Sequence, residues 1–202
     1  MNGRENFLGA SDFGPLLGLS RFKSAEQLFE EKMGRGVSEP ESLYQSVGKA
    51  LEPLVLATWA ARVGAKLLRG PEYRHPEFPW VKAALDGEAE LPTGEVVVVE
   101  SKTCSFSKRD GGWGAAGSEL IPACYWAQVQ AQLLCARANG RKVERAVVPV
   151  LFLNRLGDGP DKQPQEFEVT FDARVAASML SKAIDFWARV EAARAEQQGA
   201  MQ

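Results

Sequence analysis

The sequence is poor in the residues that most often hold transition metals or form disulfides. It contains one histidine and three cysteines, and Cys104, Cys124 and Cys135 show no C-x-x-C spacing. Three scattered thiols fit reduced cysteines better than a disulfide framework or a zinc site. His75 lies in EYRHPEF, an expected loop, and we interpret it as a surface histidine without a catalytic role. These features disfavour zinc chemistry and disulfide scaffolding.

An excess of one charge and long apolar runs are also absent. The net charge is -2, so nucleic-acid binding would have to rest on local basic residues. No apolar run approaches the ~20 residues that span a bilayer. The opening MNGRENFLGAS lacks the charged-then-apolar layout of a signal peptide. We therefore expect a cytoplasmic protein that has no membrane partner.

The composition that remains is typical of a soluble globular protein, with 45% hydrophobic and 25% charged residues. The length of 202 residues predicts a single domain over residues 1–202. Helical patterns stand before, between and after strand patterns, which predicts an α/β fold with a central mixed sheet flanked by helices. The expected helices are 25–33, 47–63, 122–138 and 173–197, the last followed by a frayed tail. The main expected strands are 95–103, 146–153 and 166–171.

The segment KAALDGEAELPTGEVVVVESKT carries the clearest chemical signal. Its valine run predicts a buried strand, and residues i and i+2 of a strand point to the same face, so Glu100 and Lys102 project together. If the preceding segment pairs antiparallel to this strand, Asp86 reaches the same edge. Two carboxylates and a lysine at one edge suit metal-assisted hydrolysis of a phosphodiester. The carboxylates would hold divalent cations, and the lysine would orient or deprotonate the attacking water.

Other polar residues can be added to this site, each with a plainer alternative. Asp86-Gly87 alone is a common turn dipeptide, and a Glu-x-Lys pair is also a common edge-strand ion pair. Glu52, on the helix before the sheet, is either a solvated glutamate or a third acidic group aimed at the cations. One face of the helix PACYWAQVQAQLL presents Tyr125, Gln128 and Gln132, which are either exposed or placed to hold a phosphate or water.

The motifs GKALE, LDGE, ESK and YWAQVQ, in this order and spacing, resemble the YqaJ/lambda-exonuclease family of phage recombination nucleases. This family is a branch of the PD-(D/E)XK nucleases. The opening block, Arg4 followed by LGASDFGPLLGLSRFKSAEQLFEEKMG, adds to the resemblance, which spans roughly residues 4–153. The resemblance implies a PD-(D/E)XK core and a Mg²⁺-dependent 5′→3′ exonuclease. Such an enzyme digests one strand of linear double-stranded DNA and leaves 3′ single-stranded tails for recombination.

The resemblance also implies roles for individual residues. Catalysis would depend on Asp86, Glu100, Lys102 and Gln128, with Gln128 positioning Lys102 or the water. Two Mg²⁺ ions, for which Mn²⁺ may substitute, would be bound by Glu52, Asp86, Glu100 and the backbone carbonyl of Ser101. The 5′-phosphate and the DNA backbone would be bound by Arg4, Ser11, Lys49, Lys108, Arg109 and Tyr125. The family further implies a homotrimeric ring, a single-strand annealing partner and a bacterial host cytoplasm.

The sequence departs from the family pattern at two positions. The proline that precedes the aspartate is replaced by Leu85, and the apolar middle residue of the E-x-K triplet is replaced by Ser101. Neither change removes a carboxylate or the lysine. The alternatives are an endonuclease, a CRISPR-adaptation exonuclease of the same superfamily, and a non-catalytic DNA-end-binding module. The CRISPR-adaptation type typically holds an iron–sulfur cluster with four cysteines, whereas this chain has three.

Overall fold

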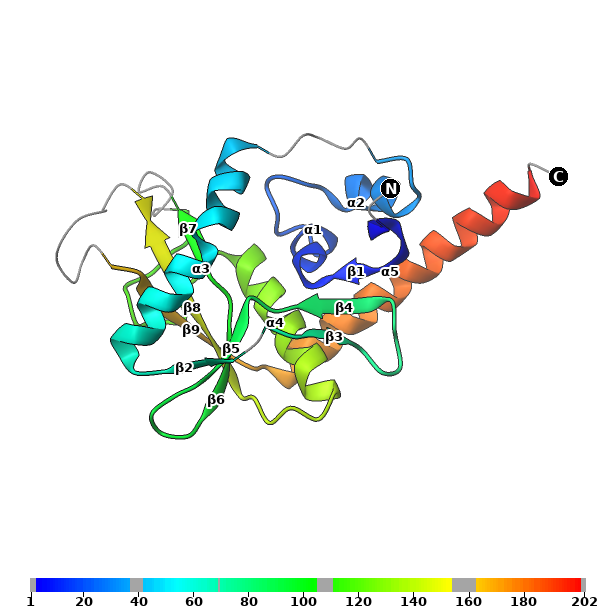
Figure 1. The fold of residues 1–202 in the computed structure, drawn as a ribbon. Helices are drawn as coiled ribbons and strands as arrows, with labels where there is room; N and C mark the ends of the chain where they lie inside the picture. Colours follow the sequence, from blue (N-terminus) through cyan, green and yellow to red (C-terminus); the bar gives the residue numbers. More distant parts are fainter. Residues whose placement is uncertain (1–2, 37–41, 69, 105–110, 154–162, 201–202) are drawn as a thin grey trace.

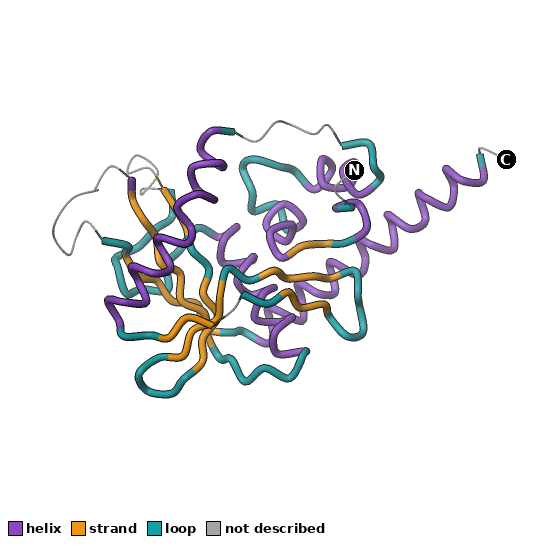
Figure 2. The backbone as a smooth tube through the Cα atoms, viewed as in Figure 1, coloured by secondary structure: helices purple, strands orange, loops and turns teal. Residues whose placement is uncertain are grey.

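The computed structural model describes residues 3–36, 42–68, 70–104, 111–153 and 163–200. Its elements form a curled mixed sheet with helices on both sides (Figure 1), and the loops between them are seen in Figure 2. The α/β class with a central mixed sheet is thus confirmed. Among the described helices, none combines the length and apolar character that a bilayer span needs.

The main sheet has the strand order β2-β5-β6-β8-β7, and β9 pairs with β8. The β6–β8 and β7–β8 pairs are parallel, whereas the β2–β5, β5–β6 and β8–β9 pairs are antiparallel. The strands are β2 (Lys66–Leu68), β5 (Gly87–Glu90), β6 (Val96–Val99), β7 (Lys102–Cys104), β8 (Arg145–Phe152) and β9 (Gln165–Thr170).

The predicted strand 95–103 is interrupted between β6 and β7. Val98 pairs with Ala146 of β8, and Lys102 pairs with Val150, so the register along β8 is the same on both sides of the break. The β6 and β7 segments therefore follow one line along β8. Glu100 and Ser101 lie between the two strand segments. The backbone N–H of Glu100 still donates to the carbonyl oxygen of Val147 in β8, whereas the N–H of Ser101 is directed to the site described below.

A second, three-stranded sheet lies beside the main one. Its order is β1-β4-β3, with β1 parallel and β3 antiparallel to β4. The chain leaves this sheet at the end of β4, passes through Leu85 and Asp86, and enters the main sheet as β5. Asp86 therefore lies where the two sheets meet. The strands are β1 (Leu8–Gly9), β3 (Glu72–Arg74) and β4 (Val81–Ala84).

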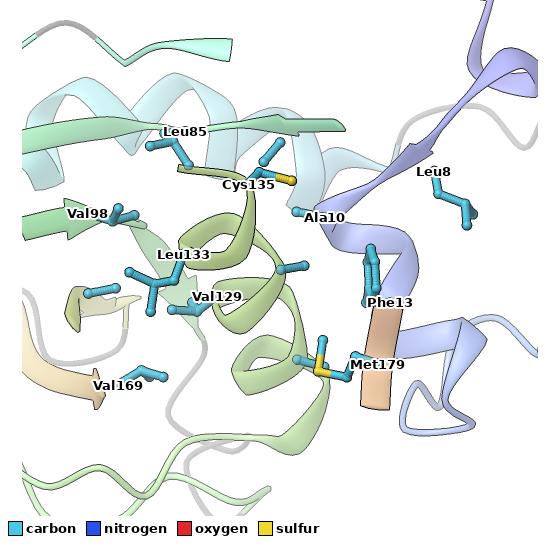
Figure 3. Close-up of a cluster of buried hydrophobic side chains, with 14 of the residues drawn as sticks. Leu8, Ala10, Phe13, Leu85, Val98, Val129, Leu133, Cys135, Val169 and Met179 are labelled. Carbon is cyan, nitrogen blue, oxygen red and sulfur yellow. The ribbon is translucent and has the colours of Figure 1, made fainter. Parts of the chain in front are cut away.

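Two helices cover opposite faces of the main sheet because β6 is apolar on both sides. Val97 and Val99 pack in a cluster with Trp59 of α3 (Leu43–Val63), whereas Val98 packs in the larger core with α4 (Ala123–Ala138) and α5 (Ala173–Gly199). Figure 3 shows Val129 and Leu133 of α4 within the larger core. Even-numbered positions of this strand therefore face α4, and odd-numbered ones face α3.

The N-terminal segment packs beside β4 and α4 (Figure 1). It comprises two 3₁₀ helices, η1 (Arg4–Asn6) and η2 (Ala10–Asp12), and the helices α1 (Phe13–Leu16) and α2 (Ala25–Lys32). Ser24 caps α2 and forms a capping box with Gln27, as the sequence predicts. The last turns of α5 project from the body of the molecule, and most of their residues are exposed.

The start of α3 differs from the prediction. The helix begins at Leu43 rather than near Val47, because Ser42 forms a capping box with Gln45. Pro53 lies inside the helix. Leu54 is 57% exposed, whereas Val55 and Trp59 form part of the buried face of the helix.

Candidate active site

The site forms where β5, β6 and β7 meet the gap in the ladder. The antiparallel register pairs Gly87 with Val99, so the preceding residue, Asp86, stands opposite Glu100. Glu100 and Lys102 both face α4, and Lys102 Nζ lies 2.5 Å from Glu100 Oε1. The antiparallel pairing that the sequence hypothesis required is present, and it brings these three charged residues to one edge of the sheet.

Glu100 is buried, with an exposed fraction of 3%, and its carboxylate is held by nitrogen donors. Oε1 accepts hydrogen bonds from Lys102 Nζ and from Gln128 Nε2, each at 2.5 Å. Oε2 accepts one from Gln132 Nε2 at 2.6 Å. A carboxylate has about four lone-pair positions, so these three bonds leave acceptor capacity on Oε2.

Asp86 is oriented by the residue that follows Glu100. Its Oδ2 accepts hydrogen bonds from the backbone N–H of Ser101 at 2.8 Å and from the Ser101 hydroxyl at 3.1 Å. Serine thus replaces the apolar residue of the family pattern with a hydroxyl that contacts the aspartate. Burial, followed by repulsion from Glu100, raises the pKa of Asp86 from 3.8 to about 7, although Lys102 and the Ser101 N–H act in the opposite direction.

Glu52 approaches the site from α3, on the other face of the sheet. Gly48 lies one turn earlier, and a Cβ built on it would stand 3.1 Å from the hydroxyl of Thr103 in β7. This contact would be tighter than most, so glycine lets α3 approach the strand without a shift of the Thr103 side chain. Burial raises the pKa of Glu52, and the charge of Glu100 raises it further. Glu52 therefore interacts electrostatically with the other two carboxylates: Glu100 raises its pKa, and Glu52 raises that of Asp86.

Lys102 is the cation that balances this acidic site. Burial acts to lower its pKa, but the contact with Glu100 and the charge of Asp86 outweigh burial, so the pKa is raised. The ammonium also lies 5.0 Å from the ring centroid of Tyr125 and 3.4 Å from Gln128 Oε1. Tyr125 and Gln128 of α4 thus hold Lys102 against Glu100.

The donor chemistry of the site fits a hard divalent cation. Asp86, Glu100 and Glu52 offer only oxygen atoms, which Mg²⁺ prefers. The pKa values of Asp86 and Glu52 are raised first by burial and then by repulsion from Glu100, and a bound cation would offset both effects. Within the described part of the chain, no three acidic, histidine or cysteine side chains stand close enough to form a ready-made metal cluster. The carboxylate of Glu100 instead contacts Lys102, Gln128 and Gln132. The carboxylate of Asp86 contacts Ser101.

A cavity of about 270 Å³ lies between the N-terminal segment and β4 and reaches the active site. Arg4 and Lys82 contribute positive charge, and Gln128 connects the cavity to Glu100. Lys82 Nζ lies 2.6 Å from Glu72 Oε2 and 4.4 Å from the centroid of the Phe7 ring. The lining residues are Arg4, Phe7, Gly9, Ala10, Ser11, Glu72, Lys82, Ala84 and Gln128.

A buried ion pair supports the wall of this cavity. Lys32 is fully buried, and its Nζ lies 2.8 Å from Asp12 Oδ2 and 3.0 Å from the carbonyl oxygen of Arg4. Asp12 also accepts a hydrogen bond from Arg4 at 3.3 Å through Oδ1. The Arg4 side chain stays 49% exposed. The α2 lysine therefore fixes the segment that carries Arg4 and Ser11, while the guanidinium keeps access to solvent.

The structure sorts the predicted site residues into three groups. Asp86, Glu100, Lys102, Gln128 and Tyr125 are joined by direct contacts, together with Ser101. Arg4 and Ser11 line the adjoining cavity. Glu52 interacts with the site through its charge, since Glu100 raises its pKa. Lys49, exposed on α3, acts to lower the pKa of Glu52. Lys108 and Arg109 lie outside the described residues.

Sequence reasoning missed two residues. Lys82 lines the cavity, but β4 alone gives no sign that the N-terminal segment folds over it. Gln132 was expected to be either exposed or placed to hold a phosphate or water, yet it is fully buried and donates to Glu100. Its spacing from Gln128, one helical turn away, was the available signal.

These features agree with comparisons with known proteins. The chain is 32% identical over 148 residues to the uncharacterised protein YqaJ of Bacillus subtilis (strain 168); the match covers 72% of this chain and 44% of that relative. The chain thus spans less than half of its relative's length. Its fold resembles an alkaline exonuclease from Laribacter hongkongensis, with a TM-score of 0.76, 18% identity, and coverage of 98% of this chain and 95% of the other.

A phage-related exonuclease from Haemophilus somnus 129PT has the same fold, with a TM-score of 0.61, 12% identity, and coverage of 97% of this chain and 96% of the other. The sequence motifs already indicated this phage-recombination family. The family model described as "YqaJ-like viral recombinase domain" matches residues 1–139. Because that match covers well over half of the chain and includes every acidic residue of the site, the protein belongs to the YqaJ-like viral recombinase family.

Proposed function

We propose that this protein is a Mg²⁺-dependent 5′→3′ exonuclease that digests one strand of linear double-stranded DNA and leaves 3′ single-stranded tails. The observation that carries the proposal is the meeting of Asp86, Glu100 and Lys102 at a break in the sheet. Membership of a viral recombinase family and a fold shared with exonucleases support a nuclease role.

The residues divide the work of phosphodiester hydrolysis. Asp86 and Glu100, helped by Glu52 and the carbonyl of Ser101, would bind two Mg²⁺ ions, and Mn²⁺ can substitute for them. Bound divalent cations supply charge relief at the phosphate and lower the pKa of water. Lys102 lies next to Glu100 and is positioned by Gln128, where its ammonium would orient the attacking water; it would take the proton of that water only with its own pKa lowered by the bound cations.

The cavity beside the site supports recognition of a 5′-phosphate. Arg4, Ser11 and Lys82 would hold the terminal phosphate by charge and hydrogen bonding, and the cavity continues to Gln128 at the catalytic edge. An end held there presents the first internucleotide bond to the site, which gives 5′→3′ polarity. Tyr125, Lys49, Lys108 and Arg109 would contact the DNA backbone.

We also propose that three copies form a ring around the DNA, as the family resemblance implies. A ring would let basic side chains such as Arg4 and Lys49 face a channel while the net charge of the chain stays at -2. In this account the enzyme works in the cytoplasm of a bacterial host with a single-strand annealing protein, which takes up the 3′ tail.

The proposal is tested by measuring acid-soluble nucleotides released from linear duplex DNA. Release should require Mg²⁺ or Mn²⁺ and should stop when EDTA is added. A covalently closed circle of the same sequence should resist digestion, and cutting of the circle would instead identify an endonuclease. Binding to DNA ends without any nucleotide release would identify a non-catalytic end-binding module.

A further inference from the structure

Gln132 of α4 combines full burial with an unmet hydrogen-bonding need. Its side chain has an exposed fraction of 0%, and Oε1 has no hydrogen-bond partner among the described residues. Buried amide oxygens are almost always paired because losing water without a replacement is unfavourable. An exception next to an active site therefore calls for a functional explanation.

The orientation of this amide is set by its neighbours. Nε2 donates to Glu100 Oε2 at 2.6 Å and lies 3.4 Å from the carbonyl oxygen of Ala84. Exchanging the amide oxygen and nitrogen would place Gln132 Oε1 against that carboxylate and carbonyl, which offer only lone pairs. The unpartnered atom is thus the oxygen.

Gln130, on the same helix, shows how a structural glutamine is paired here. It is also 0% exposed. Its Nε2 donates to the carbonyl oxygen of Thr170 at 2.7 Å, and its Oε1 accepts from the backbone N–H of Asp172 at 3.0 Å. Both ends of Gln130 are satisfied, and they join α4 to the β9–α5 connection. The fold can therefore pair a buried glutamine on α4 fully, which makes the exception at Gln132 informative.

We propose that Gln132 is a positioning residue for Glu100. Its N–H group holds Oε2, the carboxylate oxygen with spare acceptor capacity, and it also reaches the backbone just before Asp86. Its oxygen remains to accept a hydrogen bond from a donor that enters with the occupied site. This inference rests on the proposed function, because it takes Glu100 to be a ligand of the divalent cation.

The test compares Gln132→Met with the matched control Gln130→Met. Methionine keeps the length of the side chain and removes both polar groups. Mn²⁺ binding is measured by isothermal titration calorimetry on the full chain without DNA. Gln132→Met should weaken Mn²⁺ binding by about 10-fold to 100-fold. Gln130→Met should leave Mn²⁺ binding unchanged. It should lower the midpoint of thermal unfolding, because the carbonyl oxygen of Thr170 and the N–H of Asp172 lose their hydrogen-bond partner.

Wild-type Mn²⁺ affinity in Gln132→Met would overturn the proposal, as would equal losses in the two variants. If Gln132→Met does not fold, Gln132→Asn takes its place. Asparagine keeps both polar groups but is one methylene too short to reach Glu100, so the same loss is expected. Single-turnover cleavage measured over a range of Mn²⁺ concentrations gives a second reading, in which the deficit of Gln132→Met should shrink as Mn²⁺ approaches saturation. A wild-type chain that binds Mn²⁺ but releases no nucleotides would defeat the proposed function and leave the assignment of Gln132 intact.

Discussion

At the scale of single residues, the site is a balance of three negative charges and one lysine. Asp86 and Glu52 both have raised pKa values, and Lys102 supplies the compensating charge through its contact with Glu100. Such a balance leaves acidic groups that gain from a bound cation. Two predictions follow from replacing one of these charged residues, first Lys102 and then Asp86.

Replacing Lys102 by alanine should abolish cleavage without abolishing DNA binding. The variant removes the group that orients or deprotonates water but keeps every proposed metal ligand, so the cleavage rate should fall by at least ~100-fold. Single-turnover rates and binding to duplex ends, measured separately, check this. The control is Lys66→Ala, a change of the same kind at an exposed lysine of β2. A rate near that of wild type for Lys102→Ala would refute the assignment.

Replacing Asp86 by asparagine should stabilise the metal-free protein at alkaline pH. The pKa of Asp86 rises from 3.8 to about 7 on folding, so the folded state holds its proton more tightly than the unfolded chain does. Stability therefore falls as the pH rises through this range, and the full loss is present above about pH 7. Asparagine cannot ionise, so this loss is absent from the Asp86→Asn variant. The melting temperature of the variant should exceed that of the wild type by several degrees near pH 8.

That difference in melting temperature should vanish below the unfolded pKa of 3.8, where the aspartate of the wild type is protonated in both the folded and the unfolded state. Thermal unfolding in the presence of a chelator, followed over this pH range, provides the measurement. A constant difference at every pH would mean that the ionisation of Asp86 is not its source.

At the scale of elements, the break between β6 and β7 and the N-terminal wall of the cavity are the features that build the site. The sequence predicted the valine strand, because hydrophobic runs report local structure, but it left the antiparallel pairing of the preceding segment as a condition. It did not reveal β3 or β5, because Glu72–Arg74 and Gly87–Glu90 are short and carry charged residues. Their strand state depends on pairing with β4 and β6.

The limits of prediction at the site have the same origin. Asp86, Glu100 and Lys102 could be found because they stand on or beside one predicted strand. Gln132 could not be separated from an exposed glutamine by helical spacing alone, and Lys82 depends on the N-terminal segment packing over β4. Tertiary contacts between distant segments decide both cases, and local patterns do not encode them.

Replacing Lys32 by methionine should destabilise the N-terminal wall. The change removes the ammonium partner of the buried Asp12 and leaves Arg4 as its cationic neighbour, which should cost about 1.5–3 kcal/mol of unfolding free energy. Chemical denaturation measures this loss. The double variant Asp12→Leu/Lys32→Met removes both charges and should recover part of it. A double variant that is no more stable than the single one would argue against the buried pair as the cause.

Replacing Arg4 by alanine should slow digestion of 5′-phosphorylated ends selectively. Arg4 lines the cavity and keeps an exposed guanidinium, so its loss should reduce the preference for 5′-phosphate over 5′-hydroxyl ends by about 10-fold. Initial rates on matched duplexes with either end give the preference. An equal loss on both substrates would argue against a phosphate pocket.

At the scale of the whole molecule, the two sheets and the N-terminal segment place the cavity that we propose binds a DNA end directly beside the proposed hydrolytic edge. Gln128 lies in the wall of the cavity and donates to Glu100, so the two sites are joined by one side chain. This arrangement would link recognition of a DNA end to cleavage next to it. It is the structural reason for assigning exonuclease action with one polarity to a member of this family.

The most direct test uses linear duplex DNA labelled at either the 5′ or the 3′ end of the same strand, with a 5′-phosphate present, in the presence of Mg²⁺. The account predicts that the 5′ label appears in mononucleotides at the earliest time points, while the 3′ label remains in long fragments, and that Lys102→Ala releases neither. Release of the 3′ label first, or equal release by Lys102→Ala and wild type, would contradict it.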